Sequence, residues 1–244
     1  MKQNIIKETL IEQMKMKLKG SLYHETQVLF AYNTNRIEGS QLTEEQTRYI
    51  FETKTIGLEG NQALNVDDII ETHNHFKVFD YMLENVDNLL TEEMIKRYHE
   101  YIKRSTSFER VEWFAIGDYK KKTNTVSSIK TALPSQVSSE MKKLLQWYNN
   151  LVKITLKEIV EFHYKFECIH PFQDGNGRVG RLILFKECLK NNVEPFLIDD
   201  TQKLFYYRGL KEYNSERGYL EEICGASQNK YKLLCEYYLE DLNS

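Results

Sequence analysis

Residues Ile169 to Arg181 read I-H-P-F-Q-D-G-N-G-R-V-G-R, so one short stretch holds a histidine, a carboxylate, a Gly-Asn-Gly turn and two arginines. Glycines let backbone N–H groups approach an anion closely, and a loop that runs into a helix adds the positive end of the helix dipole. The stretch therefore predicts a phosphate-binding turn ahead of a helix. We expect the rest of the chain to position that turn.

The turn offers two kinds of group to an anion. Gly175, Asn176 and Gly177 at a helix N-terminus would present convergent N–H groups, which suits a diphosphate or triphosphate. Arg178 and Arg181 lie three residues apart on one helix face, and the planar guanidinium of each can grip a phosphate.

Two further side chains supply reactive chemistry. Asp174 is an oxygen ligand of the kind that Mg²⁺ uses together with substrate phosphates, and His170 is suited to take a proton from an incoming hydroxyl. The set favours nucleotidyl or phosphoryl transfer to a hydroxyl. Neither G-x-x-x-x-G-K-[ST] nor a strand followed by G-x-G-x-x-G occurs, which disfavours P-loop kinases and Rossmann enzymes.

The composition, 41% hydrophobic and 28% charged over 244 residues, is typical of a soluble globular protein. A formal net charge of −3 argues against a nucleic-acid partner, because neutralising many phosphates requires a basic face. The charged N-terminus lacks the apolar core of a signal peptide, and no apolar run is long enough to span a bilayer. We therefore expect a cytoplasmic protein without a membrane partner.

Helical periodicity and only 3 prolines predict an all-α fold in one globular unit. Residues 117–134 lack that periodicity and are rich in Thr, Ser and β-branched side chains, which predicts a short β-hairpin or extended flap. An ordinary surface loop is the alternative. The expected helices cover about 5–18, 22–38, 43–54, 65–85, 91–102, 135–150, 156–169, 178–190, 199–214 and 219–242.

Glu38 is unusual among the predicted helix ends. It falls in the last turn before Gly39, where the helix dipole is negative and a carboxylate is disfavoured by roughly 0.3 to 1 kcal/mol. Either this carboxylate is solvated or it has a cationic partner elsewhere in the fold.

The stretch His170–Arg178, followed by Arg181, resembles the signature H-P-F-x-[DE]-G-N-G-R-x-x-R of Fic-domain proteins in every specified position. The resemblance covers roughly residues 65–219. It implies the Fic fold, a helical bundle in which the turn joins two core helices and a β-hairpin flap lies over the active site. Residues 1–64 would then form N-terminal helices packed on this core, and residues 220–244 a C-terminal helix.

The resemblance also implies a reaction, which is transfer of AMP from ATP to a hydroxyl of a target protein. His170 would deprotonate a Ser, Thr or Tyr hydroxyl of that protein or of the chain itself. Asp174 would hold Mg²⁺ on the phosphates of ATP.

The anion-binding groups receive separate roles from the same resemblance. The amides of Gly175 to Gly177, with Asn176, would form the anion hole for the α- and β-phosphates. Arg178 would add to that grip, and Arg181 would bind the γ-phosphate. Doc-type kinases of the family carry Lys where this chain has Gly177, so AMP transfer is favoured over phosphate transfer.

Three positions outside the signature fall where relatives contact their substrates. Tyr207 and Asn214 would contact the nucleoside, and the flap around Val126 would align a segment of the target protein by strand addition. A core tyrosine and a helix-capping asparagine are the structural alternatives for the first two. His163 is expected to be structural.

The segment Thr34–Gly39 resembles the inhibitory motif [ST]-x-x-x-E-[GN], which implies that Glu38 pairs with Arg181 and denies it to the γ-phosphate. The implied protein is an autoinhibited adenylyltransferase with its inhibitory helix at about 22–38. Removal of AMP, transfer of UMP or phosphocholine, and a catalytically idle nucleotide-binding regulator are the alternatives.

Overall fold

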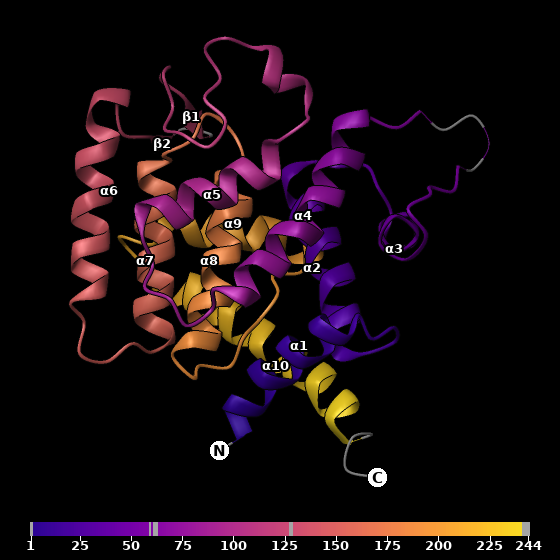
Figure 1. The fold of residues 1–244 in the computed structure, drawn as a ribbon. Helices are drawn as coiled ribbons and strands as arrows, with labels where there is room; N and C mark the ends of the chain where they lie inside the picture. The colour runs from indigo at the N-terminus through magenta and orange to yellow at the C-terminus, as the bar shows by residue number, and fades with distance from the viewer. Residues whose placement is uncertain (1, 59, 61–62, 127–128, 241–244) are drawn as a thin grey trace.

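In the computed structural model, the described residues 2–58, 60, 63–126 and 129–240 form ten α-helices, two 3-10 turns and two short strands (Figure 1). The prediction of an all-α fold is confirmed. The helices are α1 Lys2–Met16, α2 Leu22–Glu38, α3 Glu44–Thr53, α4 Val66–Glu84, α5 Glu92–Lys103, α6 Pro134–Asn149, α7 Leu156–Ile169, α8 Asn176–Lys190, α9 Lys203–Glu212 and α10 Gly218–Glu240. The 3-10 turns are η1 Ser107–Arg110 and η2 Asp200–Gln202, and the strands are β1 Thr125–Val126 and β2 Ile129–Lys130.

Local capping explains where helix α2 begins and ends. The Ser21 side chain accepts a hydrogen bond from the His24 N–H at the N-terminus. At the C-terminus Gly39 adopts φ 107°, a left-handed conformation that glycine takes without a Cβ penalty, and its N–H donates to Arg36 O. Helix α2 therefore has the predicted bounds.

The first predicted helix, 5–18, is observed at Lys2–Met16, and two further helices also differ from their predictions. Helix α8 begins at Asn176, two residues before the predicted start, because Gly175 at φ 78° serves as its N-cap. The helix predicted over 199–214 is divided into η2 and α9, because the Asp199 side chain accepts from the Thr201 N–H and starts a separate turn there.

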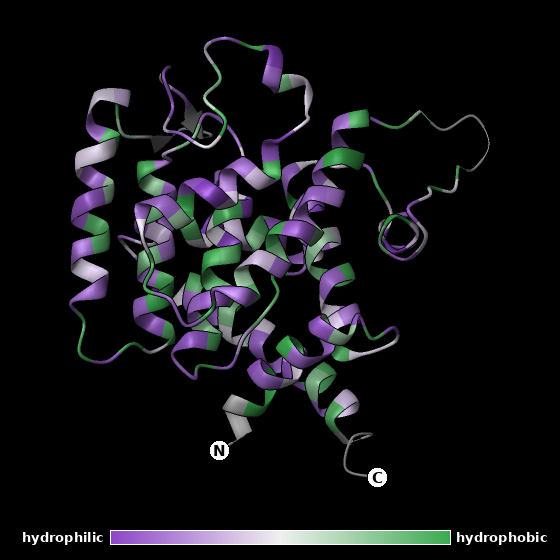
Figure 2. Ribbon diagram, in the orientation of Figure 1, coloured by the Kyte–Doolittle hydropathy of each residue, from purple (hydrophilic) through white to green (hydrophobic). Residues whose placement is uncertain are grey.

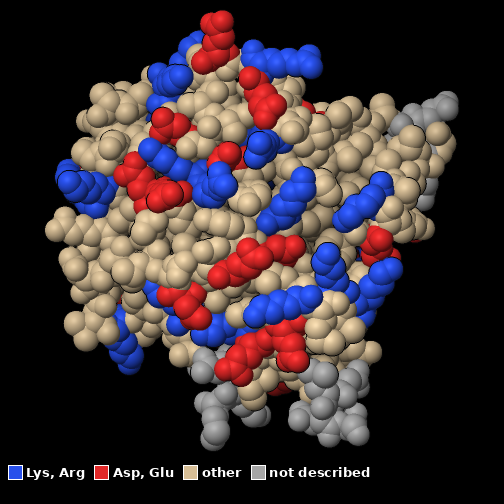
Figure 3. Space-filling model, in the orientation of Figure 1, with Lys and Arg blue, Asp and Glu red and all other residues tan. Residues whose placement is uncertain are grey.

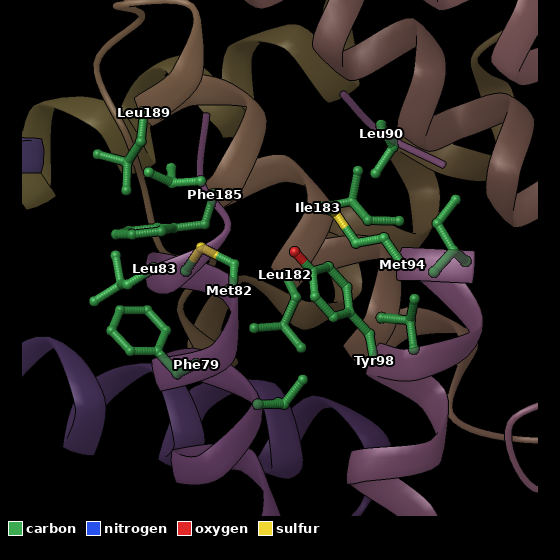
Figure 4. Packing of buried hydrophobic residues seen from close by; sticks show 14 of the residues in the cluster. Phe79, Met82, Leu83, Leu90, Met94, Tyr98, Leu182, Ile183, Phe185 and Leu189 are labelled. Carbon is green, nitrogen blue, oxygen red and sulfur yellow. The ribbon is translucent and has the colours of Figure 1, made fainter. Parts of the chain in front are cut away.

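Helix α8 lies at the centre of the bundle and is buried along almost its whole length (Figure 1). Its residues Leu182, Ile183 and Phe185 pack against Phe79 of α4 and Tyr98 of α5 (Figure 4). A helix that is buried on all sides carries no polar face to mark it in the sequence.

The N-terminal helices belong to the same core as α4, α5 and α8. Leu10 of α1 and Phe30 of α2 lie in one hydrophobic cluster with Phe79 and Phe185. Hydrophobic and hydrophilic residues alternate along the helices (Figure 2). Helix α2 is therefore part of the hydrophobic core and carries buried residues along its length.

The two strands lie between η1 and α6 and pair antiparallel, with Thr125 opposite Lys130 (Figure 1). Side chains of both strands fall outside the described residues. Acidic and basic side chains are interspersed over the face of the molecule in Figure 3, without a broad basic stripe. Among the described residues, no helix is both long and apolar enough to cross a membrane.

Candidate active site

The signature stretch forms a tight turn between the end of α7 and the start of α8. His170 follows the last residue of α7 with φ 50° and ψ 63°, and its N–H donates to Phe166 O at 2.8 Å. A left-handed conformation costs a non-glycine residue roughly 1–2 kcal/mol, so the surrounding packing must hold it. His170 and Gly175, both left-handed, reverse the chain so that α8 starts beside the histidine.

The turn is held from inside by Asn176 and Phe172. The Asn176 Oδ1 accepts from the Phe172 N–H at 2.8 Å, and its Nδ2 donates to Phe172 O at 2.9 Å. Phe172 is fully buried and stacks on His99 with ring centroids 4.0 Å apart. Because both side-chain groups of Asn176 are engaged, only its backbone N–H is left to contact an anion.

The segment before β1 is fastened to the outer side of the same turn. The Lys120 N–H donates to Pro171 O at 2.9 Å, and Asn124 Nδ2 donates to Phe172 O at 2.9 Å. The Lys120 ammonium donates to Asn124 Oδ1 and Thr131 Oγ1 at 2.7 and 2.9 Å, and burial lowers its pKa to about 8. Lys120 therefore connects both ends of the strand segment to the turn formed by the signature stretch.

Both signature arginines are almost fully buried in the first turns of α8. Arg178 forms an ion pair with Glu71 of α4, and Arg181 donates through Nε to Thr34 Oγ1 at 2.7 Å. In the part of the chain that the structure describes, Arg178 Nε and Arg181 Nη1 have no hydrogen-bond partner. Unpaired buried guanidinium N–H groups beside a helix N-terminus are donors that an anion could satisfy, so the start of α8 is a candidate anion site.

Glu38 reaches this anion site from the end of α2. Its Oε1 accepts from Arg181 Nη2 at 2.5 Å across 143 positions of sequence. A Cβ placed on Gly177 would overlap Glu38 Oε1, so the carboxylate lies directly against the first turn of α8. The unfavourable end of the α2 dipole is therefore offset by the favourable end of the α8 dipole and by Arg181.

A second charged cluster surrounds Asp174. Lys103 of α5 donates to Asp174 Oδ2 at 2.6 Å and also pairs with Glu71, which in turn pairs with Arg178. Burial raises the pKa of Asp174, but Arg178 and Lys103 together hold it well below its usual range. Asp174 is thus a fixed carboxylate whose side chain keeps 42% of its exposure.

Sequence reasoning did not identify Glu71 and Lys103. Lys103 lies in the last turn of α5, and Glu71 lies one turn into α4, so each resembles an ordinary surface charge. Both side chains are buried in the fold and organise Arg178 around Asp174. No pattern within either helix distinguishes them, because the partner lies on another element.

A cavity of about 1110 Å³ opens beside this cluster. Its charged lining includes Glu38, Glu71, Lys103, Asp174 and Arg178. The rest comes from residues 64–68 and 105–110 at the ends of α4 and α5, with Asn35, Gly39, Ser40 and Ile70. A volume near 1,000 Å³ is that of a small-molecule site. Of the signature residues, Asp174 and Arg178 line this cavity.

The expected nucleoside contacts lie in different surroundings. Tyr207 of α9 donates from its hydroxyl to Ile37 O at 3.3 Å, next to Glu38, and burial raises its pKa to about 12. Asn214 is exposed in the turn after α9 and contacts Tyr164 of α7. The side chain of Val126, expected to dock a target, lies outside the described residues.

Comparisons with known proteins agree with the resemblance noted in the sequence. Residues 89–187 match the model of the Fic/DOC family. The chain is 24% identical over 198 residues to "Protein adenylyltransferase fic-1" of Caenorhabditis elegans, and 27% identical over 192 residues to "Protein adenylyltransferase Fic" of Nematostella vectensis. These alignments cover 79% and 75% of the chain, but only 38% and 42% of the relatives. The chain thus spans about two fifths of the length of these curated relatives.

Solved structures show the same fold. A Fic domain containing signaling protein from Bacteroides thetaiotaomicron superposes with a TM-score of 0.71 at 22% identity, covering 93% of this chain and 90% of that one. The helical arrangement expected from the signature is therefore confirmed as that of Fic-domain structures.

Proposed function

Because residues 89–187 carry a domain of the Fic/DOC family, we propose that the chain is an autoinhibited protein adenylyltransferase. It transfers AMP from ATP to a hydroxyl of a target protein or of itself. The observation that carries the proposal is the anion site at the start of α8, where Arg178 Nε and Arg181 Nη1 lack partners within the described residues. Such donors suit the oxygens of a polyphosphate.

The proposed reaction uses groups at both ends of the signature turn. The target hydroxyl attacks the α-phosphorus of ATP, a new O–P bond forms, and the bond to the β-phosphate oxygen breaks with loss of pyrophosphate. His170 takes the hydroxyl proton. The N–H groups of Gly175, Asn176 and Gly177 and the guanidinium of Arg178 stabilise the charge that develops on the phosphate oxygens.

Mg²⁺ fits this site only in company with the nucleotide. In the described part of the chain, no group of three or more His, Cys, Asp or Glu side chains could hold a metal ion. Asp174 is a partly exposed carboxylate directly before Gly175, and Lys103 already contacts its Oδ2. A bound Mg²⁺ would neutralise phosphate charge, with Asp174 as its protein ligand and phosphate and water oxygens as the others.

Glu38 keeps the proposed enzyme in a resting state. Its carboxylate contacts Arg181 and lies over Gly177, where the γ-phosphate of a productively bound ATP would have to lie. Two anions cannot share this site, so ATP either binds in another pose or displaces Glu38. Thr34 holds Arg181 through two hydrogen bonds, from Nε to Oγ1 and from Nη2 to the backbone oxygen.

The target protein would meet the strands near the catalytic turn. Because Lys120 and Asn124 fasten the strand segment to Pro171 and Phe172, a peptide paired with β1 around Val126 would be held close to His170. Tyr207 and Asn214 are the proposed contacts of the nucleoside. Backbone pairing with a flap would accept many sequences, which suits modification of a protein with an accessible hydroxyl.

Radiolabelled ATP tests the proposal directly. Glu38→Gly should increase self-labelling at least about tenfold, because Arg181 becomes free to bind the γ-phosphate. A gain of about 1.4 kcal/mol in the binding free energy of productively bound ATP corresponds to a factor of ten. Adding His170→Ala to Glu38→Gly should abolish the labelling. Equally low labelling by the wild type and Glu38→Gly would remove the support for inhibition by Glu38.

Intact-mass analysis distinguishes the alternatives. Glu38→Gly protein is incubated separately with ATP, UTP, GTP and CDP-choline, and we expect the mass of one AMP to be added with ATP. A gain with UTP or CDP-choline instead would identify a different transferase. Loss of AMP from a premodified protein in the wild type alone would favour removal of AMP. No change with any donor would favour an idle nucleotide-binding regulator.

A further inference from the structure

A carboxylate lies behind the catalytic histidine. Glu167 precedes His170 by three residues on α7, so the two side chains share one face of the chain. Glu167 Oε2 lies 3.7 Å from His170 Nδ1, and the two side chains retain only 13% and 14% of their exposure. His170 Nδ1 has no hydrogen-bond partner among the described residues, which leaves Glu167 as the charged group it faces.

The space around Glu167 depends on a glycine of α8. A Cβ on Gly180 would lie 2.8 Å from Glu167 Oε1 and 2.8 Å from His163 Nδ1, closer than real side-chain contacts. Because Gly180 has no side chain, Glu167 and His163 of α7 can pack directly against α8. His163 is held in turn by the Tyr206 hydroxyl, 2.6 Å from its Nε2.

The groups that face Glu167 come from three helices. Burial raises the pKa of Glu167, but the polar contact with His170 and the nearby His163 and Arg181 side chains bring it below its ordinary value. Burial lowers the pKa of His163 to about 4, so that ring is neutral at physiological pH. Tyr206 of α9 completes the set, and Glu167 is the fixed negative charge within it.

We propose that Glu167 is a positioning residue that holds the His170 imidazole by its Nδ1 and leaves Nε2 free to accept the proton of the target hydroxyl. The role rests on the adenylyl transfer proposed above. A carboxylate at one ring nitrogen keeps the proton there and fixes the orientation of the ring. As the new O–P bond forms and pyrophosphate leaves, the proton moves to Nε2 and the imidazolium acquires a counter-charge already in place.

Steady-state kinetics test this role in the Glu38→Gly background. Glu167→Gln should lower kcat for AMP transfer by at least about tenfold, since a well-placed general base contributes about 10² to 10⁴ in rate. The KM for ATP should stay within about twofold of the parent value. Glu167 is not among the proposed phosphate-binding groups and acts on one of them, Arg181, only through its charge. The midpoint of the acidic limb of kcat/KM should move to lower pH.

Glu161→Gln is the matched control. Glu161 lies on the same helix and pairs with Lys165 and Arg217, away from His170. It should leave kcat and the pH profile unchanged. Glu167→Asp keeps the negative charge on a shorter side chain, so it should keep the parent pH profile while kcat falls. This variant also tests the proposal if Glu167→Gln folds poorly.

Ring titration by NMR provides a readout that needs no turnover. Histidine-labelled protein is titrated, and the His170 signal is assigned by its absence in His170→Ala. Its midpoint should move to lower pH in Glu167→Gln and remain in place in Glu161→Gln. A fall in kcat without movement of either midpoint would show a merely structural role and overturn the proposal. Absence of AMP transfer in all variants would count against the proposed function, while the ring titration would still decide the role of Glu167.

Discussion

His75 shows what burial does to a single titratable residue in this fold. The side chain is fully buried on α4, and neither ring nitrogen has a hydrogen-bond partner among the described residues. Its ring meets Phe30 edge-on, with centroids 4.9 Å apart. Burial, followed by the charges of Arg178 and Arg181, lowers its pKa to about 3. His75 is therefore neutral in the folded protein.

This depressed pKa predicts acid sensitivity. The unfolded chain binds a proton at His75 near pH 6.5 and the folded chain only near pH 3, so the stability present above 6.5 is lost as the pH falls between these values. His99 and His163, with pKa values lowered by burial to about 3 and 4, act in the same direction. We expect the free energy of unfolding to decrease between pH 7 and pH 5.

Urea unfolding at pH 7 and pH 5 measures the contribution of His75. His75→Leu should reduce the loss between the two pH values by about 1–2 kcal/mol, whatever its effect on stability at pH 7. His73→Leu, at a half-buried position on the same helix, should reduce it less. An unchanged loss in His75→Leu would show that His75 is protonated in the folded state.

At the level of helices, the contact of α7 with α8 positions both parts of the proposed active site. Helix α7 ends at Ile169, directly before His170, and α8 begins at Asn176, directly after Gly175. The relative position of the two helices would therefore set the distance from the proposed base to the phosphates. Gly180 lies at their contact, and a Cβ there would come within 2.7 Å of His163 Cε1. The close approach of the two helices requires glycine at this position.

Two helical glycines allow a matched test of this contact. Gly180→Ala should destabilise the protein by about 1–3 kcal/mol, because overpacking outweighs the gain in helix propensity. Gly225→Ala lies in α10 with no other atom within 4 Å of the added carbon, so it should stabilise by up to about 1 kcal/mol. Thermal unfolding measures the stability of both variants. A stabilising effect of Gly180→Ala would contradict the close contact of α7 with α8 at Gly180.

Helix α2 connects the proposed inhibition to the stability of the whole molecule. Its last residue, Glu38, contacts Arg181, while its middle residue Phe30 packs against Phe79 and Phe185 in the main core. Twelve of its side chains are buried, so α2 cannot leave the active site without opening the core. We infer that inhibition is relieved by movement near Glu38 rather than by release of α2.

The core and inhibitory roles of α2 should separate in mutants. Phe30→Ala should cost about 3–5 kcal/mol of unfolding free energy, as truncation of a buried phenylalanine does. Leu204→Ala, at an exposed position of α9, should change stability by no more than about 0.5 kcal/mol. Glu38→Gly should stay much closer to the wild type than Phe30→Ala, and comparable losses in both would contradict a local release. Chemical denaturation of the three variants provides the comparison.

Features that depend on near neighbours could be predicted from the order of the residues alone. The signature turn could be recognised because its glycines, Asp174 and His170 lie within a few positions of one another and must act together. The bounds of α2 followed from Ser21 and Gly39, since a cap satisfies backbone groups within one turn. The all-α fold likewise followed from apolar spacing along each helix.

Which charges from separate helices meet depends on the packing of the folded chain. Lys103, Glu71 and Glu167 carry no local sign of their roles, because the partner of a helix residue depends on how the helices rotate and cross. Burial then converts ordinary side chains into a fixed network around Asp174 and His170. The helix-end Glu38 acquires its place in the same way, since α2 packs with its C-terminus against the N-terminus of α8.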